Sequence, residues 1–173
     1  MKRLFLLRHA KSSWDDPTLG DFDRPLNPRG RAAAEAMGRE LRALGLGFDV
    51  VVASPARRVV ETLARVARGY GRDLAPQLDR KLYAAGADGL LSIVRATDDA
   101  VGALLLVGHN PGLHQLALRL SAADGGATFK KLSVKFPTAA LAEIVFSVEP
   151  WGKVAAGKGR LERFIRPRDL RGA

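Results

Sequence analysis

Cysteine is absent from the 173-residue sequence, and its apolar runs are short. Without thiols the chain forms neither disulfides nor thiolate metal sites, which fits a reducing setting. The apolar run that begins at Leu4 stops at Arg8, too early for the hydrophobic region of a signal peptide. No stretch approaches the length of a transmembrane helix. We therefore expect a cytoplasmic protein with no membrane partner.

Aromatic residues are also scarce, at 6%, whereas the formal net charge is +10. A basic chain suits an anionic partner such as phosphate, nucleic acid or an acidic protein surface. An ordinary solvated basic surface explains the charge equally well. Proteins that bind single-stranded nucleic acid place aromatic side chains among the basic ones as stacking platforms, and this sequence interleaves none. We therefore expect no nucleic-acid partner.

Short apolar runs alternate with longer stretches of helical periodicity, and the 47% of hydrophobic residues is enough for a sizeable core. The expected strands cover residues 4–7, 50–53, 103–107, 141–148 and 160–165. The expected helices cover residues 28–44, 55–70, 90–94 and 111–120. This alternation predicts one α/β domain over residues 1–173. We expect a three-layer sandwich whose mixed, mostly parallel sheet carries helices on both faces.

Three of the expected helices begin with a capping residue followed by proline. The pairs are Asn27-Pro28, Ser54-Pro55 and Asn110-Pro111. A capping side chain satisfies a free N–H group of the first turn, and proline suits the first helical position. We therefore interpret Ser54 and Asn110 as caps rather than as catalytic groups.

Three of the expected strands end in polar residues. Arg8 and His9 follow the first strand, Arg58 lies just beyond the second, and His109 follows the third. Ligands of open α/β sheets bind at the carboxyl ends of the strands, and helix N-termini there favour anions. We expect these four side chains to surround one phosphoryl group. The remaining histidine, His114, lies inside a helical pattern and is interpreted as structural.

These residue types suit phosphoryl transfer without a metal or another cofactor. A neutral imidazole is a competent nucleophile toward phosphorus, and its phosphorylated form is readily hydrolysed. Guanidinium groups hold phosphate oxygens and stabilise the charge of the transition state. The same cations disfavour protonation of His9, and His109 can donate to a phosphate oxygen. We expect no bound metal, because the arginines already supply positive charge.

The three strand ends resemble the motifs of the histidine phosphatase superfamily. Arg8-His9-Ala10 resembles its RHG signature, and Gly108-His109 resembles its third motif. The second motif is matched by Ser54-Pro55-x-x-Arg58-x-x-x-Thr62. The resemblance covers roughly residues 3–148 and implies a phosphoglycerate-mutase-like fold.

Within that superfamily the chain resembles the SixA-like phosphohistidine phosphatases. The similarity lies in the short chain, in the run from Arg8 to Trp14 and in Arg24-Pro25-Leu26. It implies that His9 is the phosphorylated nucleophile and that Arg8, Arg58 and His109 bind phosphate. Arg24 is a further candidate for the phosphate pocket.

The sequence departs from the superfamily pattern at two points. Ala10 replaces the usual glycine, which is tolerable where the backbone has an ordinary conformation. Many members use a glutamate as general acid, but this chain has none between Glu61 and Glu143. Asp79 and Asp88 are the carboxylates nearest the expected place.

The missing glutamate favours a substrate with a good leaving group. We therefore expect a phosphatase that acts on a phosphohistidine protein. Two alternatives stay open: a small-molecule phosphomonoesterase with the same fold, and a non-catalytic phosphate-binding regulatory module.

Overall fold

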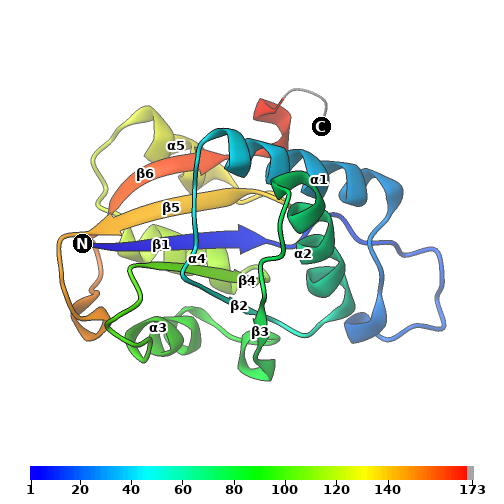
Figure 1. Ribbon diagram of the computed structural model, residues 1–173, viewed down its shortest axis with the longest axis horizontal. Helices are drawn as coiled ribbons and strands as arrows, with labels where there is room; N and C mark the ends of the chain where they lie inside the picture. Colours follow the sequence, from blue (N-terminus) through cyan, green and yellow to red (C-terminus); the bar gives the residue numbers. More distant parts are fainter. Residues whose placement is uncertain (171–173) are drawn as a thin grey trace.

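A computed structural model describes residues 1–170 and contains a six-stranded mixed sheet (Figure 1). The strands are β1 (Lys2–Arg8), β2 (Val50–Ala53), β3 (Gln77–Leu78), β4 (Ala103–Gly108), β5 (Leu141–Phe146) and β6 (Arg160–Ile165). Their order across the sheet is β3-β2-β4-β1-β5-β6. The first four strands are parallel, and β5 runs antiparallel to both β1 and β6. The expected mixed, mostly parallel sheet is confirmed.

Helices cover both faces of this sheet, which confirms the three-layer α/β architecture (Figure 1). They are α1 (Pro28–Ala43), α2 (Arg57–Tyr70), α3 (Ala87–Arg95), α4 (Gly112–Leu120) and α5 (Ala127–Val134). Successive side chains of a strand point to opposite faces. Phe5 and Leu7 of β1 therefore pack in the core under α1 and α2, whereas Leu4 and Leu6 pack against α3, α4 and α5.

The first helix begins and ends as the sequence predicts. Asn27 caps α1 by accepting a hydrogen bond from the Gly30 N–H at 2.7 Å, and Pro28 occupies the first helical position. Gly45 follows the helix with a φ of 65°, a left-handed conformation that glycine adopts readily.

The two other expected caps are wrong. The α2 helix begins at Arg57 after Ala56, and α4 begins at Gly112 after Pro111, so neither Ser54 nor Asn110 stands at the capping position. A Ser-Pro or Asn-Pro pair also starts tight turns, and here each pair forms a turn that precedes the helix. The Ser54 hydroxyl accepts from the Ala56 N–H at 3.2 Å within that turn.

The sequence pattern does not predict two of the elements. The strand β3 has only two residues, both exposed, at the edge of the sheet. The helix α5 buries a single residue, Leu132. Its sequence has no continuous apolar stripe from which a helix could be predicted. Within residues 1–170, every helix is too short or too polar to span a lipid bilayer.

The segments that matter for function meet at one end of the sheet, the edge formed by the carboxyl ends of its parallel strands. The carboxyl ends of β1, β2 and β4 lie there because these strands are parallel. Since β5 is antiparallel to its neighbours, β5 starts and β6 ends at the same edge. Side chains that follow β1, β2, β4 and β6 therefore meet on this side of the molecule.

Candidate active site

The backbone of His9 is fixed by two neighbouring strands. The His9 N–H donates to the Gly108 carbonyl at the end of β4, at 3.1 Å. The Ala139 N–H, just before β5, donates to the carbonyls of both His9 and Arg8, at 3.0 and 3.1 Å. Ala139 adopts a φ of 60° to make this contact. The imidazole is therefore presented from a backbone held on both sides.

A third element holds the residue that follows. The Ala10 N–H donates to Thr62 Oγ1 in α2 at 2.9 Å, and the same hydroxyl donates to the Arg58 carbonyl at 2.6 Å. Ala10 is fully buried, and it is not among the residues with positive φ. Alanine therefore fits where the superfamily signature has glycine.

The start of α1 lies directly against the loop after His9. A side chain added at Gly30 would place its Cβ 2.1 Å from the Lys11 carbonyl oxygen. The Asn27 N–H donates to this same carbonyl at 3.0 Å. Only glycine allows such a close approach, so Gly30 sets the position of the loop after His9 on α1.

The imidazole of His9 has one nitrogen engaged and one free. Its Nδ1 lies 2.7 Å from the Ala10 carbonyl oxygen. A carbonyl only accepts, so Nδ1 carries the proton and the lone pair resides on Nε2. Burial, followed by the charges of Arg58, His109 and Arg8, lowers the pKa of His9 to about 3 against an opposing effect of the Ala10 hydrogen bond. His9 is therefore a neutral imidazole near pH 7.

His109 lies beside His9, with 5.3 Å between the ring centroids. Arg58 Nη2 approaches His109 Nδ1 at 3.3 Å, and an arginine only donates. The other nitrogen, Nε2, therefore carries the proton and donates to Ser54 Oγ at 2.8 Å. Burial, followed by the charge of Arg58, lowers the pKa of His109 to about 4.

Arg8 and Arg58 bring two guanidinium groups to this pair of histidines. Arg58 is 6% exposed and donates from Nη1 to the Asp21 carbonyl at 2.6 Å and from Nη2 to the Asp21 carboxylate at 3.0 Å. Arg8 Nη1 donates to the Phe136 carbonyl at 3.1 Å. The Nε atoms of both arginines are buried and have no hydrogen-bond partner among the described residues. Arg58 also lowers the pKa of Arg8, after the larger effect of burial, so the two cations lie close together and suit a shared anion.

Arg24 lies in the same network. Its Nη1 donates to Ser12 Oγ at 2.6 Å, and its Nη2 donates to the Asp21 carboxylate at 3.1 Å. Its guanidinium stacks 3.5 Å over the ring of Trp14. The structure therefore joins Arg24 to Arg58 through the shared Asp21.

Asp21 and Tyr83 are the members of this site that the sequence did not reveal. The Tyr83 hydroxyl donates to Asp21 Oδ2 at 2.6 Å, and its ring meets the ring of His109 edge-on at 5.5 Å. The hydrogen bond from Tyr83, with those from Arg24 and Arg58, holds the pKa of Asp21 well below its usual range. Asp21 is thus an ionised group that orients the arginines.

The two carboxylates considered as general acids lie outside this network. Asp79 accepts from the Lys81 N–H at 2.9 Å at the start of a short 3-10 helix, and Asp88 pairs with Arg119. Glu143 is buried in β5 between Arg3 and Arg163. None of the three forms a hydrogen bond or ion pair with the predicted site residues.

The structure places the other predicted residues as follows. His114 Nε2 lies 2.7 Å from the Leu132 carbonyl oxygen, which joins α4 to α5 in a structural role. Asn110 donates to the Phe136 carbonyl at 2.9 Å, the same acceptor that Arg8 uses. In the part of the chain that the structure describes, histidine and carboxylate side chains nowhere gather in a group of three suited to a metal ion.

Comparison with known proteins identifies the family of the chain. The model of the histidine phosphatase superfamily (branch 1) matches residues 4–83, which include His9 and Arg58. An uncharacterized protein of Mycobacterium tuberculosis, Rv1276c, is 35% identical over 164 residues, 94% of this chain and 100% of that protein.

Two solved structures share the whole architecture and are each named "putative phosphohistidine phosphatase SixA". The protein from Nakamurella multipartitia is 29% identical, with a TM-score of 0.82 over 96% of both chains. The protein from Agrobacterium tumefaciens is 30% identical, with a TM-score of 0.79 over 96% of this chain and 98% of its own. Taken with the six-stranded sheet and the paired histidines at its edge, these matches show that the chain belongs to the histidine phosphatase superfamily, in its SixA-like branch.

Proposed function

We propose that this protein is a metal-independent phosphatase that removes phosphate from phosphohistidine residues of another protein through a phospho-His9 intermediate. The observation that carries the proposal is the hydrogen bond between His9 Nδ1 and the Ala10 carbonyl. This bond fixes the tautomer in which the Nε2 lone pair is free, beside His109, the buried Arg58 and the half-buried Arg8. The names of the two similar solved structures support the same substrate class.

In the first step, His9 Nε2 attacks phosphorus and the bond between phosphorus and the substrate imidazole breaks. Arg8, Arg58 and His109 hold the phosphoryl oxygens, whose charge is spread over the transition state. The dianionic phosphoryl group raises the proton affinity of His109, which then donates to an oxygen. The substrate imidazole carries a proton on its other nitrogen, so it departs as a neutral imidazole.

In the second step, water attacks phospho-His9, which releases inorganic phosphate and restores the neutral imidazole. The Ala10 carbonyl keeps its hydrogen bond to Nδ1 throughout, so the ring does not turn away between the steps. The protein supplies position and charge, and the arginines do the work that a metal ion does in other phosphatases.

The choice of a phosphohistidine substrate rests on the carboxylates around the site. An alkyl phosphate expels an alkoxide, which needs a proton in the transition state, and such general acid catalysis contributes roughly 10²- to 10⁴-fold. Asp21 belongs to the site network, but three donors keep it ionised. An imidazole leaves without this help.

The test is a comparison of kcat/KM for a phosphohistidine peptide, an aryl phosphate and a set of sugar phosphates. We expect the first two to be hydrolysed much faster than the sugar phosphates, and we expect acid-labile phosphate to be trapped on His9 during turnover. His9→Ala should abolish turnover while phosphate or vanadate still binds through the arginines.

Two results would contradict the proposal. Equal or faster hydrolysis of the sugar phosphates would favour the small-molecule phosphomonoesterase. Phosphate binding without turnover of any substrate would favour the non-catalytic phosphate-binding module.

A further inference from the structure

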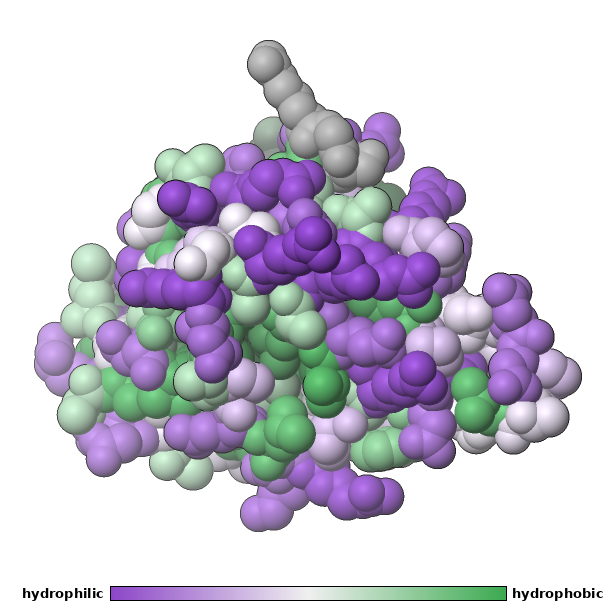
Figure 2. Space-filling model, turned by 45° about the vertical axis from the view of Figure 1, so that its right-hand side comes forward, coloured by the Kyte–Doolittle hydropathy of each residue, from purple (hydrophilic) through white to green (hydrophobic). Residues whose placement is uncertain are grey.

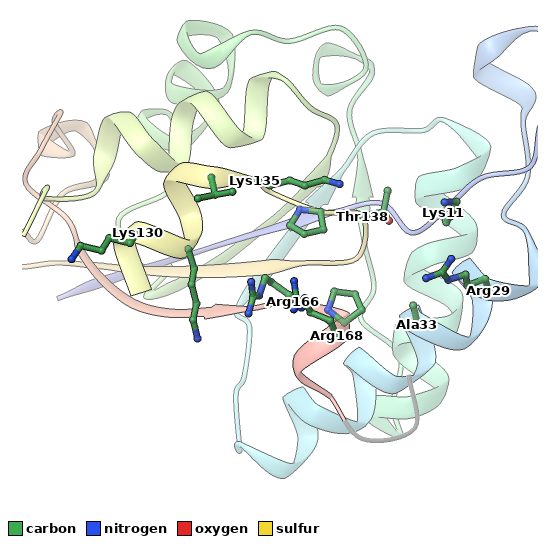
Figure 3. A pocket seen from close by; sticks show the side chains of 12 residues that line it. Lys11, Arg29, Ala33, Lys130, Lys135, Thr138, Arg166 and Arg168 are labelled. Carbon is green, nitrogen blue, oxygen red and sulfur yellow. The ribbon is translucent and has the colours of Figure 1, made fainter. Parts of the chain in front are cut away.

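A concave surface lies beside the candidate active site. It is a groove of about 630 Å³ between the start of α1, the end of α5 and the segment after β6 (Figure 3). Seven of its lining residues are lysine or arginine, and none is acidic. Six of these cations are exposed: Lys11, Arg29, Lys130, Lys131, Lys135 and Arg168. We call this surface the basic groove.

The basic groove adjoins the nucleophile from two directions along the chain. Lys11 follows His9 by two residues. Lys135 and Pro137 flank Phe136, whose carbonyl accepts from Arg8 at 3.1 Å. The groove also lies at the edge of the sheet where β1 ends, because β5 starts and β6 ends there. Figure 2, which brings this edge forward, shows strongly hydrophilic side chains gathered over the upper part of the face.

The positive charge of the groove is largely uncompensated. Arg166 pairs with Asp169 at 2.8 Å, and the charge of Lys131 also acts on Asp169. The six exposed cations themselves form no ion pair with any residue in the range 1–170. Positive charges gathered on a concave surface repel one another, so they do not stabilise the fold. Charge of this kind steers and binds an anionic partner.

The lining between the cations is apolar and aliphatic. Val134 is 83% exposed, and Ala33 and Pro137 lie on the same surface. No phenylalanine, tyrosine or tryptophan lines the groove, so bases would find no stacking platform. Interleaved lysine and aliphatic side chains are complementary to a protein surface that offers both acidic and apolar groups.

We infer that the basic groove binds an acidic surface of the phosphorylated substrate protein and places its phosphohistidine over His9. The inference rests on the proposed function and adds the chemistry of the partner: the substrate carries aspartate and glutamate beside the phosphorylated histidine. Attraction between the two surfaces accelerates their encounter and selects among phosphohistidine proteins.

A charge reversal in the groove tests this inference. The groove variant is Lys130→Glu with Lys135→Glu, which leaves the residues of the phosphate pocket untouched. The control variant is Lys153→Glu with Lys158→Glu, two exposed lysines between β5 and β6 at the opposite edge of the sheet. Both variants change the net charge by the same amount, so the comparison isolates position.

The first measurement is the binding of an unphosphorylated acidic peptide. Fluorescence anisotropy monitors this binding at several salt concentrations. It does not require catalysis, so it separates a failure of this inference from a failure of the proposed function. We expect the groove variant to bind at least about tenfold more weakly than the wild type at low salt, with a shallower salt dependence. The control variant should bind like the wild type.

The second measurement is kcat/KM for two phosphohistidine peptides of equal length, one with acidic and one with neutral flanks. We expect the wild type and the control variant to favour the acidic peptide, and the groove variant to lose this preference. Hydrolysis of p-nitrophenyl phosphate should be the same in all three proteins, because this small substrate does not reach the groove.

Three outcomes would overturn the inference. Equal binding of the acidic peptide by wild type and groove variant would show that the groove does not recognise acidic surfaces. Equal losses in both variants would show an effect of net charge alone. Tighter binding of a random oligonucleotide than of the acidic peptide, abolished only in the groove variant, would assign the groove to nucleic acid.

Discussion

Replacement of His9 by glutamine should make the fold less sensitive to acid. The wild-type imidazole is 8% exposed and lies among Arg8, Arg58 and His109, which keep it neutral in the folded state. In the unfolded chain it is solvated and takes up a proton near pH 6.5. Unfolding therefore binds a proton at mildly acidic pH, and acid favours the unfolded chain. Glutamine is similar in size and has no proton to gain.

The size of the effect follows from the two pKa values. In the folded protein the pKa of His9 is about 3, so the folded state holds fewer protons than the unfolded chain from that pH up to about 6.5. Each pKa unit corresponds to ~1.4 kcal/mol, so lowering the pH from 7 to 4.5 costs the wild type roughly 2.5 kcal/mol of unfolding free energy through His9 alone. The stability is present above pH 6.5 and is lost as the pH falls. His109 adds a loss of the same sign that both proteins share.

The assay is urea denaturation at pH 7 and at pH 4.5, for the wild type and for His9→Gln. Buffers must be free of phosphate and sulfate, because an anion in the pocket would raise the pKa of His9. We expect the variant to lose about 2–3 kcal/mol less than the wild type between the two pH values. Gln115→Ala, an exposed substitution on α4 that removes no ionisable group, should lose as much as the wild type.

The reasoning would be refuted by equal losses of stability in the wild type and in His9→Gln. An NMR titration gives an independent check on the same point. A His9 imidazole that titrates near pH 6.5 in the folded protein would show that burial and the neighbouring cations do not keep it neutral. That result would contradict the assignment of a free lone pair to Nε2.

Three further predictions concern catalysis. Arg58→Ala should lower kcat/KM by roughly 10²- to 10³-fold, because it removes a donor to the phosphoryl oxygens. An NMR titration should show a higher pKa for His109 once this cation is gone. An unchanged rate would show that Arg58 does not bind the phosphoryl group. Asp79→Asn and Asp88→Asn should leave phosphohistidine hydrolysis nearly unchanged, since neither carboxylate reaches the site network, and a large loss in either variant would identify an acid. Activity should survive EDTA, whereas complete loss that a divalent ion restores would contradict arginine-based charge stabilisation.

Much of the fold could be predicted from the sequence because β1, β2 and β4 contain apolar runs bounded by polar residues, and β6 alternates in part between polar and apolar residues. The boundaries of β2 and β6 match the prediction, and the end of β1 placed His9 at the edge of the sheet. The same logic placed Arg58 and His109 there, since strands that run in parallel end together. The two-residue β3 and the nearly unburied α5 lack any such pattern.

The contacts that complete the site could not be predicted from local sequence. Asp21 meets Arg58 across 37 residues and Tyr83 across 62, because the loop after β1 packs against the start of α2 and against the segment after β3. The Ser-Pro pair predicts that Ser54 caps a helix, yet Ser54 hydrogen-bonds His109, which lies 55 residues further along the chain. Capping signals describe neighbours along the chain, whereas these partners are set by the sheet.

The backbone hydrogen bonds around His9 have a dynamic consequence. The peptide groups next to this residue are bound by Gly108, Ala139 and Thr62, which belong to three different parts of the fold. A local fluctuation cannot release His9 unless these parts separate together, so its amide should exchange with solvent only in the rare global opening of the protein. The conformational entropy of positioning His9 is then lost once, during folding. Under the proposed function, His9 would not adapt to its substrate, and a phosphorylated side chain would have to protrude far enough to reach it.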